Sequence, residues 1–271
     1  MATARRNLLL RAATVAVLLP VALLAVWAGN PTLLILTALM VLLGTWEMRA
    51  IANGTGWGFV AWIALPLALL LVPAPVVELT AAIVLLAVAA GLVLGGVFVT
   101  MRASVAGTRA RLLASVGAAI YVGGLAAALP AIRDLPEGLR WVVFLLAVVW
   151  AYDICAYAVG MTVGRHLVEP RLSPRKTWEG VGGGLAGALL AGGLMSLLLD
   201  ASLWLLLAAA AATAIAAQAG DLFESALKRR AGVKDSGRLV PGHGGILDRI
   251  DSLLFAGPVV FAFATFSSGP G

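Results

Sequence analysis

Long apolar runs separated by short polar breaks follow one another along most of the chain. Most of the runs are about 17 to 25 residues long, which is the length that an α-helix needs to cross the hydrocarbon core of a bilayer. Turn-like sequences such as Asn30-Pro31 and Asp200-Ala201-Ser202 separate them. The pattern predicts an all-α, polytopic integral membrane protein with about nine transmembrane helices. The predicted spans lie near residues 12–28, 31–49, 57–73, 78–99, 112–131, 140–161, 180–199, 202–220 and 251–267.

The composition supports a membrane protein. Of the 271 residues, 62% are hydrophobic and only 12% are charged, which is far from the balance of a soluble domain with a charged surface. Internal repeats, low-complexity tracts and linkers are not evident. We therefore expect one membrane domain over residues 1–271, with N-terminal helices in residues 1–150 and the chemistry-bearing helices and loops in residues 151–271.

The N-terminal segment allows two interpretations. Three arginines precede the first apolar run, and Val26-Trp27-Ala28 resembles the cleavage site of a signal peptide. Because a further apolar span follows at once, we expect the first helix to be retained.

The distribution of basic residues predicts an orientation in the membrane. With the N-terminus in the cytosol and nine spans, 17 of the 19 basic residues fall on the cytosolic side, and only Arg133 and Arg140 fall outside. A wrong number of spans in the middle of the chain would scramble this partition. The net charge of +6 is therefore interpreted as a topology signal, and no nucleic-acid partner is expected because basic residues are not interleaved with aromatics in a patch.

Residues 221–251 hold eleven of the 32 charged residues and are the richest candidate for chemistry. Asp221, Glu224 and Lys228 recur at a spacing that places them on one helix face. Asp248 and Asp251 are three residues apart where the last helix should begin. Glycines and prolines interrupt the sequence between these two groups, so a loop is expected whose backbone N–H groups can approach phosphate. Carboxylates beside basic groups and such a loop are suited to Mg²⁺ and a polyphosphate.

Each of these residues also has a plain structural interpretation. Glu224 and Lys228 at i, i+4 can form an ordinary helix salt bridge, and Asp248 or Asp251 can favour a helix N-terminus. Lysine usage points towards chemistry, because only Lys176, Lys228 and Lys234 among the 19 basic residues are lysines, and all three lie in two predicted cytosolic segments.

The second of these segments runs from Asp153 to Gly180. Asp153 lies within or at the edge of an apolar span, where an acid is costly and marks either a functional site or a buried pair. Ser173 and Lys176 precede a predicted helix that has Thr177 as its N-cap candidate and Glu179 in its first turn. This arrangement fits an anion site or simply a capped helix start. With two histidines in the chain, a histidine-based metal site is not expected.

Taken together, these motifs resemble the phosphatidate cytidylyltransferase (CDP-diacylglycerol synthase) family. The resemblance is carried by S-x-L-K-R at 225–229, K-D-x-G at 234–237 and P-x-H-G-G-x-x-D-R-x-D at 241–251. Two further motifs support it, S-P-R-K-T-W-E-G at 173–180 and D-x-x-A-Y at 153–157. The first 150 residues are similar to the family only in forming several transmembrane helices. Val240 and Arg175 depart from the usual residues without removing a needed group.

The resemblance implies that CTP and phosphatidate react to give CDP-diacylglycerol and pyrophosphate. It implies Mg²⁺ as cofactor, with a monovalent cation such as K⁺ as an optional second ion, and a homodimer in the bilayer of a bacterial plasma membrane with its active site facing the cytosol. The implied catalytic residues are Lys228, Asp248, Asp221 and His243. The implied metal ligands are Asp221, Asp248 and Asp251. The implied substrate-binding residues are Ser173, Lys176, Thr177, Ser225, Arg229, Lys234, Asp235, Gly244, Gly245, Arg249 and Asp153.

Two other functions remain open from the sequence. A CTP-dependent polyprenol or dolichol kinase would transfer the γ-phosphate and release CDP instead of pyrophosphate. An ion-coupled secondary transporter would use Asp153 and Asp221 as coupling acids, which accounts for the acid in an apolar span but not for the dense cytosolic charge cluster.

Overall fold

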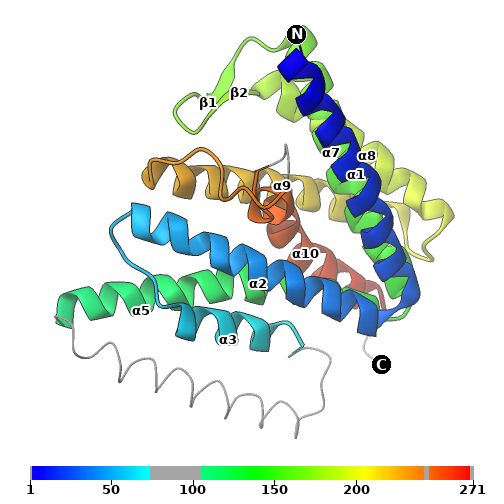
Figure 1. Cartoon of the computed structure of the whole chain (residues 1–271). Coiled ribbons are helices and arrows are strands. Elements are labelled where there is room, and N and C mark those ends of the chain that lie inside the picture. Colours follow the sequence, from blue (N-terminus) through cyan, green and yellow to red (C-terminus); the bar gives the residue numbers. More distant parts are fainter. Residues whose placement is uncertain (1, 74–104, 241–243, 269–271) are drawn as a thin grey trace, which may run out of the picture. The chain divides into compact units, whose positions relative to one another are not determined.

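The computed structural model describes residues 2–73, 105–240 and 244–268, and most of these residues are helical. Short turns and one small hairpin join the helices (Figure 1). The elements are α1 (Ala2–Ala28), α2 (Asn30–Gly54), α3 (Ala61–Leu71), α5 (Val105–Ala119), the π-helical turn η1 (Ile120–Gly124), α6 (Ala128–Asp134), α7 (Gly138–Val163), β1 (Leu167–Glu169), β2 (Ser173–Thr177), α8 (Trp178–Leu194), the 3₁₀ turn η2 (Met195–Leu197), α9 (Leu203–Arg230) and α10 (Leu247–Ser268).

The predicted polytopic membrane protein is confirmed. Within the described residues, six helical stretches are long and apolar enough to cross a membrane. Large apolar side chains lie exposed on them, including Trp204 and Leu197, each 80% exposed, as expected where lipid is the solvent. The six stretches are Asn30–Gly54, Gly107–Asp134, Gly138–Val163, Trp178–Leu197, Leu203–Arg230 and Leu247–Ser267.

The predicted number of nine spans is not confirmed. The span predicted at 12–28 lies within α1 (Ala2–Ala28), whose stretch Ala16–Ala28 is apolar. The span predicted at 57–73 contains α3, which has only 11 residues. Gly56 and Gly58 adopt positive φ angles of 78° and 74°, so the chain turns there and the helix begins later than the hydropathy suggests. The span predicted at 78–99 lies outside the described residues.

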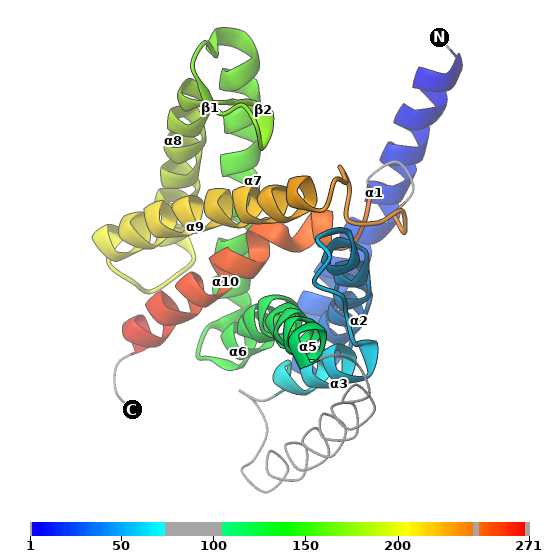
Figure 2. The same cartoon turned by 90° about the vertical axis from the view of Figure 1, so that its left-hand side faces the viewer.

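The chain forms two compact units, and the predicted division near residue 150 stays a prediction. The first unit contains residues 1–130 and 227–250. In it, α3 packs beside α2 and α5 (Figures 1 and 2). Gly44 of α2 allows close packing, because a Cβ there would lie 3.2 Å from Val122 and 3.8 Å from Leu247. Near the end of the same helix, a Cβ on Gly54 would lie 2.7 Å from the carbonyl oxygen of Ala231. The loop that follows α9 therefore packs directly on α2.

The second unit contains residues 131–226 and 251–271. Its α7 and α8 run side by side (Figures 1 and 2), and glycines of α8 make this possible. A Cβ on Gly184 would lie 2.7 Å from the Tyr152 ring, and one on Gly187 would lie 2.5 Å from the Cys155 sulfur. Where α9 meets α10, a Cβ on Gly220 would lie 2.5 Å from the carbonyl oxygen of Asp251. Small residues thus let these helix backbones approach closely.

An antiparallel hairpin of β1 and β2 joins α7 to α8 and was not predicted. Its strands have only three and five residues, too few for a clear alternation of apolar and polar positions. The predicted start of α8 is confirmed, because Thr177 is the N-cap and its Oγ1 accepts a hydrogen bond of 3.1 Å from the Gly180 N–H. Glu179, in the first turn as predicted, accepts hydrogen bonds from the N–H groups of Arg165 and His166 and ties the hairpin base to the helix.

Candidate active site

The first unit contains a buried ion pair between Lys228, in the last turn of α9, and Asp248, in the first turn of α10. The Lys228 Nζ lies 2.5 Å from Asp248 Oδ1, and the two side chains are only 11% and 6% exposed. Glu224, the alternative partner considered for Lys228, is fully buried on the same helix. The structure therefore brings together two of the predicted catalytic residues, which are twenty positions apart in the sequence.

The glycine-rich loop between α9 and α10 supplies most of the remaining hydrogen bonds to Asp248. The Oδ2 atom accepts hydrogen bonds from the Ser236 N–H at 3.0 Å, the Ser236 hydroxyl at 3.0 Å and the Gly245 N–H at 2.8 Å. Gly244 has a φ of 86°, and a Cβ there would lie 2.6 Å from Oδ2. Glycine is needed at that position both for the backbone angle and for the space. Two backbone N–H groups of the predicted phosphate loop thus bind this carboxylate.

Glu47 of α2 also binds this loop and was not predicted from the sequence. Its side chain is 4% exposed and accepts hydrogen bonds from the Ser236 hydroxyl at 2.9 Å, the Ile246 N–H at 3.0 Å and the Leu247 N–H at 2.9 Å. The available signal was the one used for Asp153, an acid inside an apolar run. Lys228, Ser236, Gly245 and Asp248, together with Glu47, are called the Asp248 cluster below.

A second group of polar side chains lies in the second unit, around Asp221 of α9. Lys176 of β2 forms an ion pair with the Asp221 carboxylate and donates a hydrogen bond of 3.1 Å to Gln218 Oε1. The Ser225 hydroxyl lies 3.3 Å from Asp221 Oδ1, and the Tyr152 hydroxyl donates to Gln218 Oε1 at 3.0 Å. These five residues are called the Asp221 cluster. The structure thus brings together the predicted Lys176, Asp221 and Ser225.

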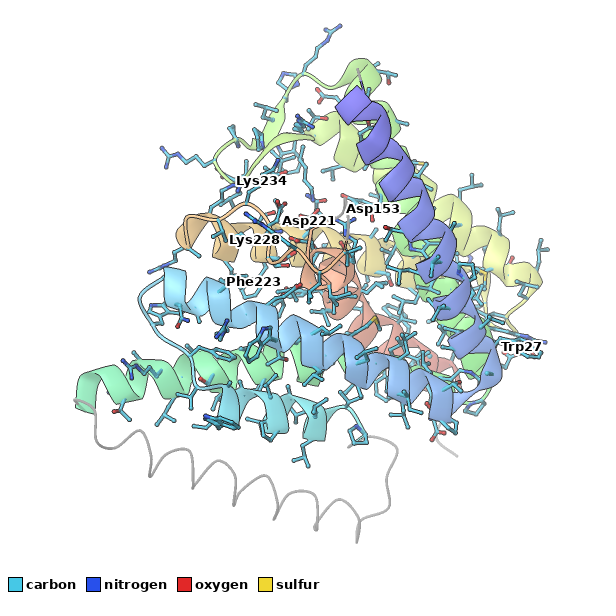
Figure 3. All side chains as sticks on the ribbon, viewed as in Figure 1. Trp27, Asp153, Asp221, Phe223, Lys228 and Lys234 are labelled. Carbon is cyan, nitrogen blue, oxygen red and sulfur yellow. The ribbon has the colours of Figure 1, made fainter. Side chains whose placement is uncertain are left out.

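Gln218 and Tyr152 were not predicted. Gln218 lies three residues before Asp221 on the same helix face, so a polar residue at that spacing in an apolar run was the available signal. Tyr152 precedes Asp153 in α7 and is buried, whereas Asp153 itself is exposed. Figure 3 shows Asp221 and Lys228 on α9 and Asp153 on α7.

The other predicted site residues have varied surroundings. Thr177 is buried as the cap of α8, and Ser173 pairs with Glu169 in the hairpin. Arg229 donates a hydrogen bond of 3.1 Å to the Val233 carbonyl. Asp251 lies on α10 where that helix meets α9 at Gly220. Lys234, Asp235 and Arg249 are exposed, and His243 lies outside the described residues.

The chemistry of these side chains fits a hard divalent cation. Among the described residues, no group of three or more His, Cys, Asp or Glu side chains gathers in the way a protein-only metal cage requires. Mg²⁺, however, is usually held by one or two carboxylates, with waters and substrate phosphates completing its shell. Asp221, Asp248 and Asp251 offer carboxylate oxygens of this kind, and each cluster also supplies a lysine that can bind phosphate.

The chain is similar in sequence to proteins of one known family. The model of the cytidylyltransferase family matches residues 9–267. A phosphatidate cytidylyltransferase of Brucella suis is 46% identical over 153 residues, which are 55% of this chain and 56% of that protein. Proteins of the same name from Staphylococcus epidermidis and Staphylococcus saprophyticus are 45% and 47% identical over 126 residues, 46% of this chain and 48% of each of them. The matched stretch thus covers about half the length of these relatives.

Proposed function

Because the chain belongs to the cytidylyltransferase family, we propose that it transfers the cytidylyl group of CTP to phosphatidate, giving CDP-diacylglycerol and pyrophosphate. The observation that carries the proposal is the pair of lysine–aspartate contacts, Lys228 with Asp248 and Lys176 with Asp221. Ammonium groups that bind carboxylates can equally bind phosphate oxygens, and carboxylates beside them can bind a divalent cation. The same relationship supports the transferase over a polyprenol kinase or a transporter.

The reaction needs little covalent work from the protein. A phosphate oxygen of phosphatidate attacks the α-phosphorus of CTP, a new P–O bond forms, and the bond to the β-phosphate breaks as pyrophosphate leaves. The protein must bring two polyanions together and neutralise the charge on the transferring group. We assign this task to Lys228 and Lys176, whose ammonium groups turn from the carboxylates to phosphate oxygens when CTP binds. Arg229, Lys234 and Arg249 are assigned to the remaining phosphate oxygens.

The metal proposal follows from the carboxylates. Asp221, Asp248 and Asp251 would hold Mg²⁺, which supplies positive charge beside the triphosphate when bound. Ser236 and Gly245 hold one oxygen of Asp248 in place, and Lys228 contacts the other. A carboxylate oxygen can accept more than one interaction, so Oδ1 retains capacity for a cation. Further residues are assigned to substrate binding, namely Ser173, Thr177, Ser225, Asp235, Gly244 and Asp153, with His243 as a phosphate contact or base.

The membrane location is part of the proposal. The chain is a multi-pass membrane protein, and phosphatidate stays in a leaflet, whereas CTP and Mg²⁺ are cytosolic solutes. We therefore propose that the chemistry takes place at headgroup depth on the cytosolic side of a bacterial plasma membrane, and that the protein is a homodimer. The excess of basic residues in the predicted cytosolic loops supports this orientation.

The test is an assay of purified protein in detergent with CTP, Mg²⁺ and either phosphatidate or a polyprenol. The expected result is CDP-diacylglycerol and pyrophosphate in equal amounts with phosphatidate, none after chelation of Mg²⁺ and restored turnover when Mg²⁺ is added back. Release of CDP with the polyprenol, without pyrophosphate, would show a lipid kinase instead. Absence of turnover with both lipids, together with ion-coupled uptake in vesicles, would favour a transporter.

A further inference from the structure

The carboxylate of Glu47 is enclosed by two stretches of the glycine-rich loop, at Ser236–Gly237 and at Gly245–Leu247. It accepts three hydrogen bonds of 2.9 to 3.0 Å from these stretches. A Cβ on Gly237 or Gly245 would overlap the Glu47 carboxylate oxygens. Glycine is therefore required at both positions for the loop backbone to close around this side chain. The Glu47 side chain and the loop backbone are therefore sterically complementary.

Ser236 links Glu47 directly to Asp248. Its hydroxyl oxygen lies 2.9 Å from Glu47 Oε2 and 3.0 Å from Asp248 Oδ2. The hydroxyl has a single hydrogen, which is shared between the two carboxylates, and the Ser236 N–H donates a separate bond of 3.0 Å to Asp248 Oδ2. The loop residue held by Glu47 is thus the residue that holds Asp248.

Glu47 also fixes the start of the helix that bears Asp248. The first N–H groups of an α-helix have no partner within the helix and need an external acceptor when they are buried. The N–H groups of Ile246 and Leu247, immediately before Asp248, both donate to Glu47. The acceptor comes from a different helix, 200 residues before Leu247, so this contact sets the position of α10 and not only its local hydrogen bonding.

We infer that Glu47 is a positioning residue for the Asp248 cluster. Its carboxylate, presented by the apolar helix α2, holds Ser236 and the N-terminus of α10 together and so sets the direction in which the Asp248 carboxylate and its partner Lys228 face. The inference rests on the proposed function, in which these two residues act on CTP. A small displacement of such groups lowers the rate by as much as about 100-fold.

Glu47→Gln is the sharpest test, because it keeps the size of the side chain and removes one acceptor oxygen. The amide NH₂ must face either the Ile246 N–H or the Leu247 and Ser236 donors, so at least one contact is lost. The expected kcat falls about 10- to 100-fold while the KM for CTP stays within about twofold, because the lost interaction concerns orientation in the transition state. Amide exchange at residues 246 and 247, followed by mass spectrometry, should be at least tenfold faster.

The matched control is Thr37→Val on the same helix, equally buried and isosteric, with wild-type kcat and exchange expected. Ser236→Ala serves if Glu47→Gln does not fold. It breaks the link to Asp248 and leaves the bonds to Ile246 and Leu247, so kcat should fall while exchange at 246 and 247 stays slow. Adding Glu47→Gln to Ser236→Ala should lower kcat no further than Glu47→Gln alone does, because both act through the same link.

Two results would overturn the inference. Wild-type kcat per folded molecule in Glu47→Gln and Ser236→Ala, with only the melting temperature lowered, would show a purely structural helix cap. Unchanged amide exchange in Glu47→Gln would show that the carboxylate does not hold the loop. Failure of the proposed function is distinguishable, because the wild-type protein would then not convert CTP and phosphatidate, while the exchange experiment still decides whether Glu47 anchors the loop.

Discussion

Neutralising one member of the Lys228–Asp248 pair leaves the other as a charge in surroundings that exclude most water. The side chains are 11% and 6% exposed, so solvent cannot replace the lost partner. Breaking a buried pair in this way typically costs about 3 to 5 kcal/mol. We therefore expect Asp248→Asn and Lys228→Met each to lower the free energy of unfolding by about 3 kcal/mol or more and to lower CTP turnover by at least about 100-fold.

The double variant separates stability from chemistry. With Asn at 248, the amide oxygen can take the place of Oδ2 and accept from Ser236 and Gly245, which leaves the NH₂ group facing the Lys228 ammonium. Replacing that ammonium by Met removes the donor–donor contact. The double variant should therefore recover about 2 kcal/mol relative to Asp248→Asn. Turnover should not recover, because both charged groups are then absent.

The assay is thermal and denaturant unfolding in detergent, with turnover measured on the same preparations. Arg238→Gln is the matched control, because it removes an exposed basic residue from the same loop and should change neither quantity. Single variants that are as stable as the wild-type protein, or a double variant that loses the sum of the two single effects, would refute the reasoning from the buried pair.

Three further predictions concern the second unit. Lys176→Arg should lower turnover at least about tenfold, because the wide guanidinium cannot reproduce the compact contact with Asp221 and Gln218. The free energy of unfolding should change by less than about 1 kcal/mol, because both paired side chains are partly exposed. Unchanged turnover would remove Lys176 from the site. Gly184→Ala should destabilise the protein by about 1 to 3 kcal/mol, because its Cβ would lie 2.7 Å from the Tyr152 ring. Gly182→Ala, whose Cβ would enter open space, should be neutral or stabilising in the same thermal scan. Equal effects of the two substitutions would contradict the packing. Thr177→Ala should lower the unfolding free energy by about 1 kcal/mol and Thr177→Ser should not, and the reverse order would show that the hydroxyl does not cap α8.

The residue types of the site were readable because charge is rare in this chain. The charged residues Lys228, Asp248, Lys176 and Asp221 stand out in an apolar sequence, whereas Ser225 was indicated only by the family resemblance. Helical spacing alone places Asp221 and Lys228 on one face of α9. Which lysine meets which aspartate was not readable. The Lys228–Asp248 contact joins the ends of two helices through a loop of irregular backbone, and no periodicity describes a loop.

Glu47 shows a second limit of prediction from the sequence. As a single acid in an apolar run it had the same sequence signal as Asp153, but nothing along the chain indicates that its acceptors serve Ser236 and Leu247, nearly 200 residues later. Gln218 is similar, because its partner Lys176 lies in a hairpin whose strands are too short to be recognised from a pattern.

By itself, the sequence determined that the chain lies in a lipid bilayer and that its secondary structure is helical. Uncharged runs of bilayer length must form helices in lipid, because every backbone N–H and C=O group needs a partner within its own segment. Only the tertiary structure decided which polar groups meet. A buried carboxylate accepts hydrogen bonds from the donors that the packing of other elements brings within about 3 Å of it. For Glu47 and Asp248, those donors depend on glycines that let the loop backbone close around the two carboxylates.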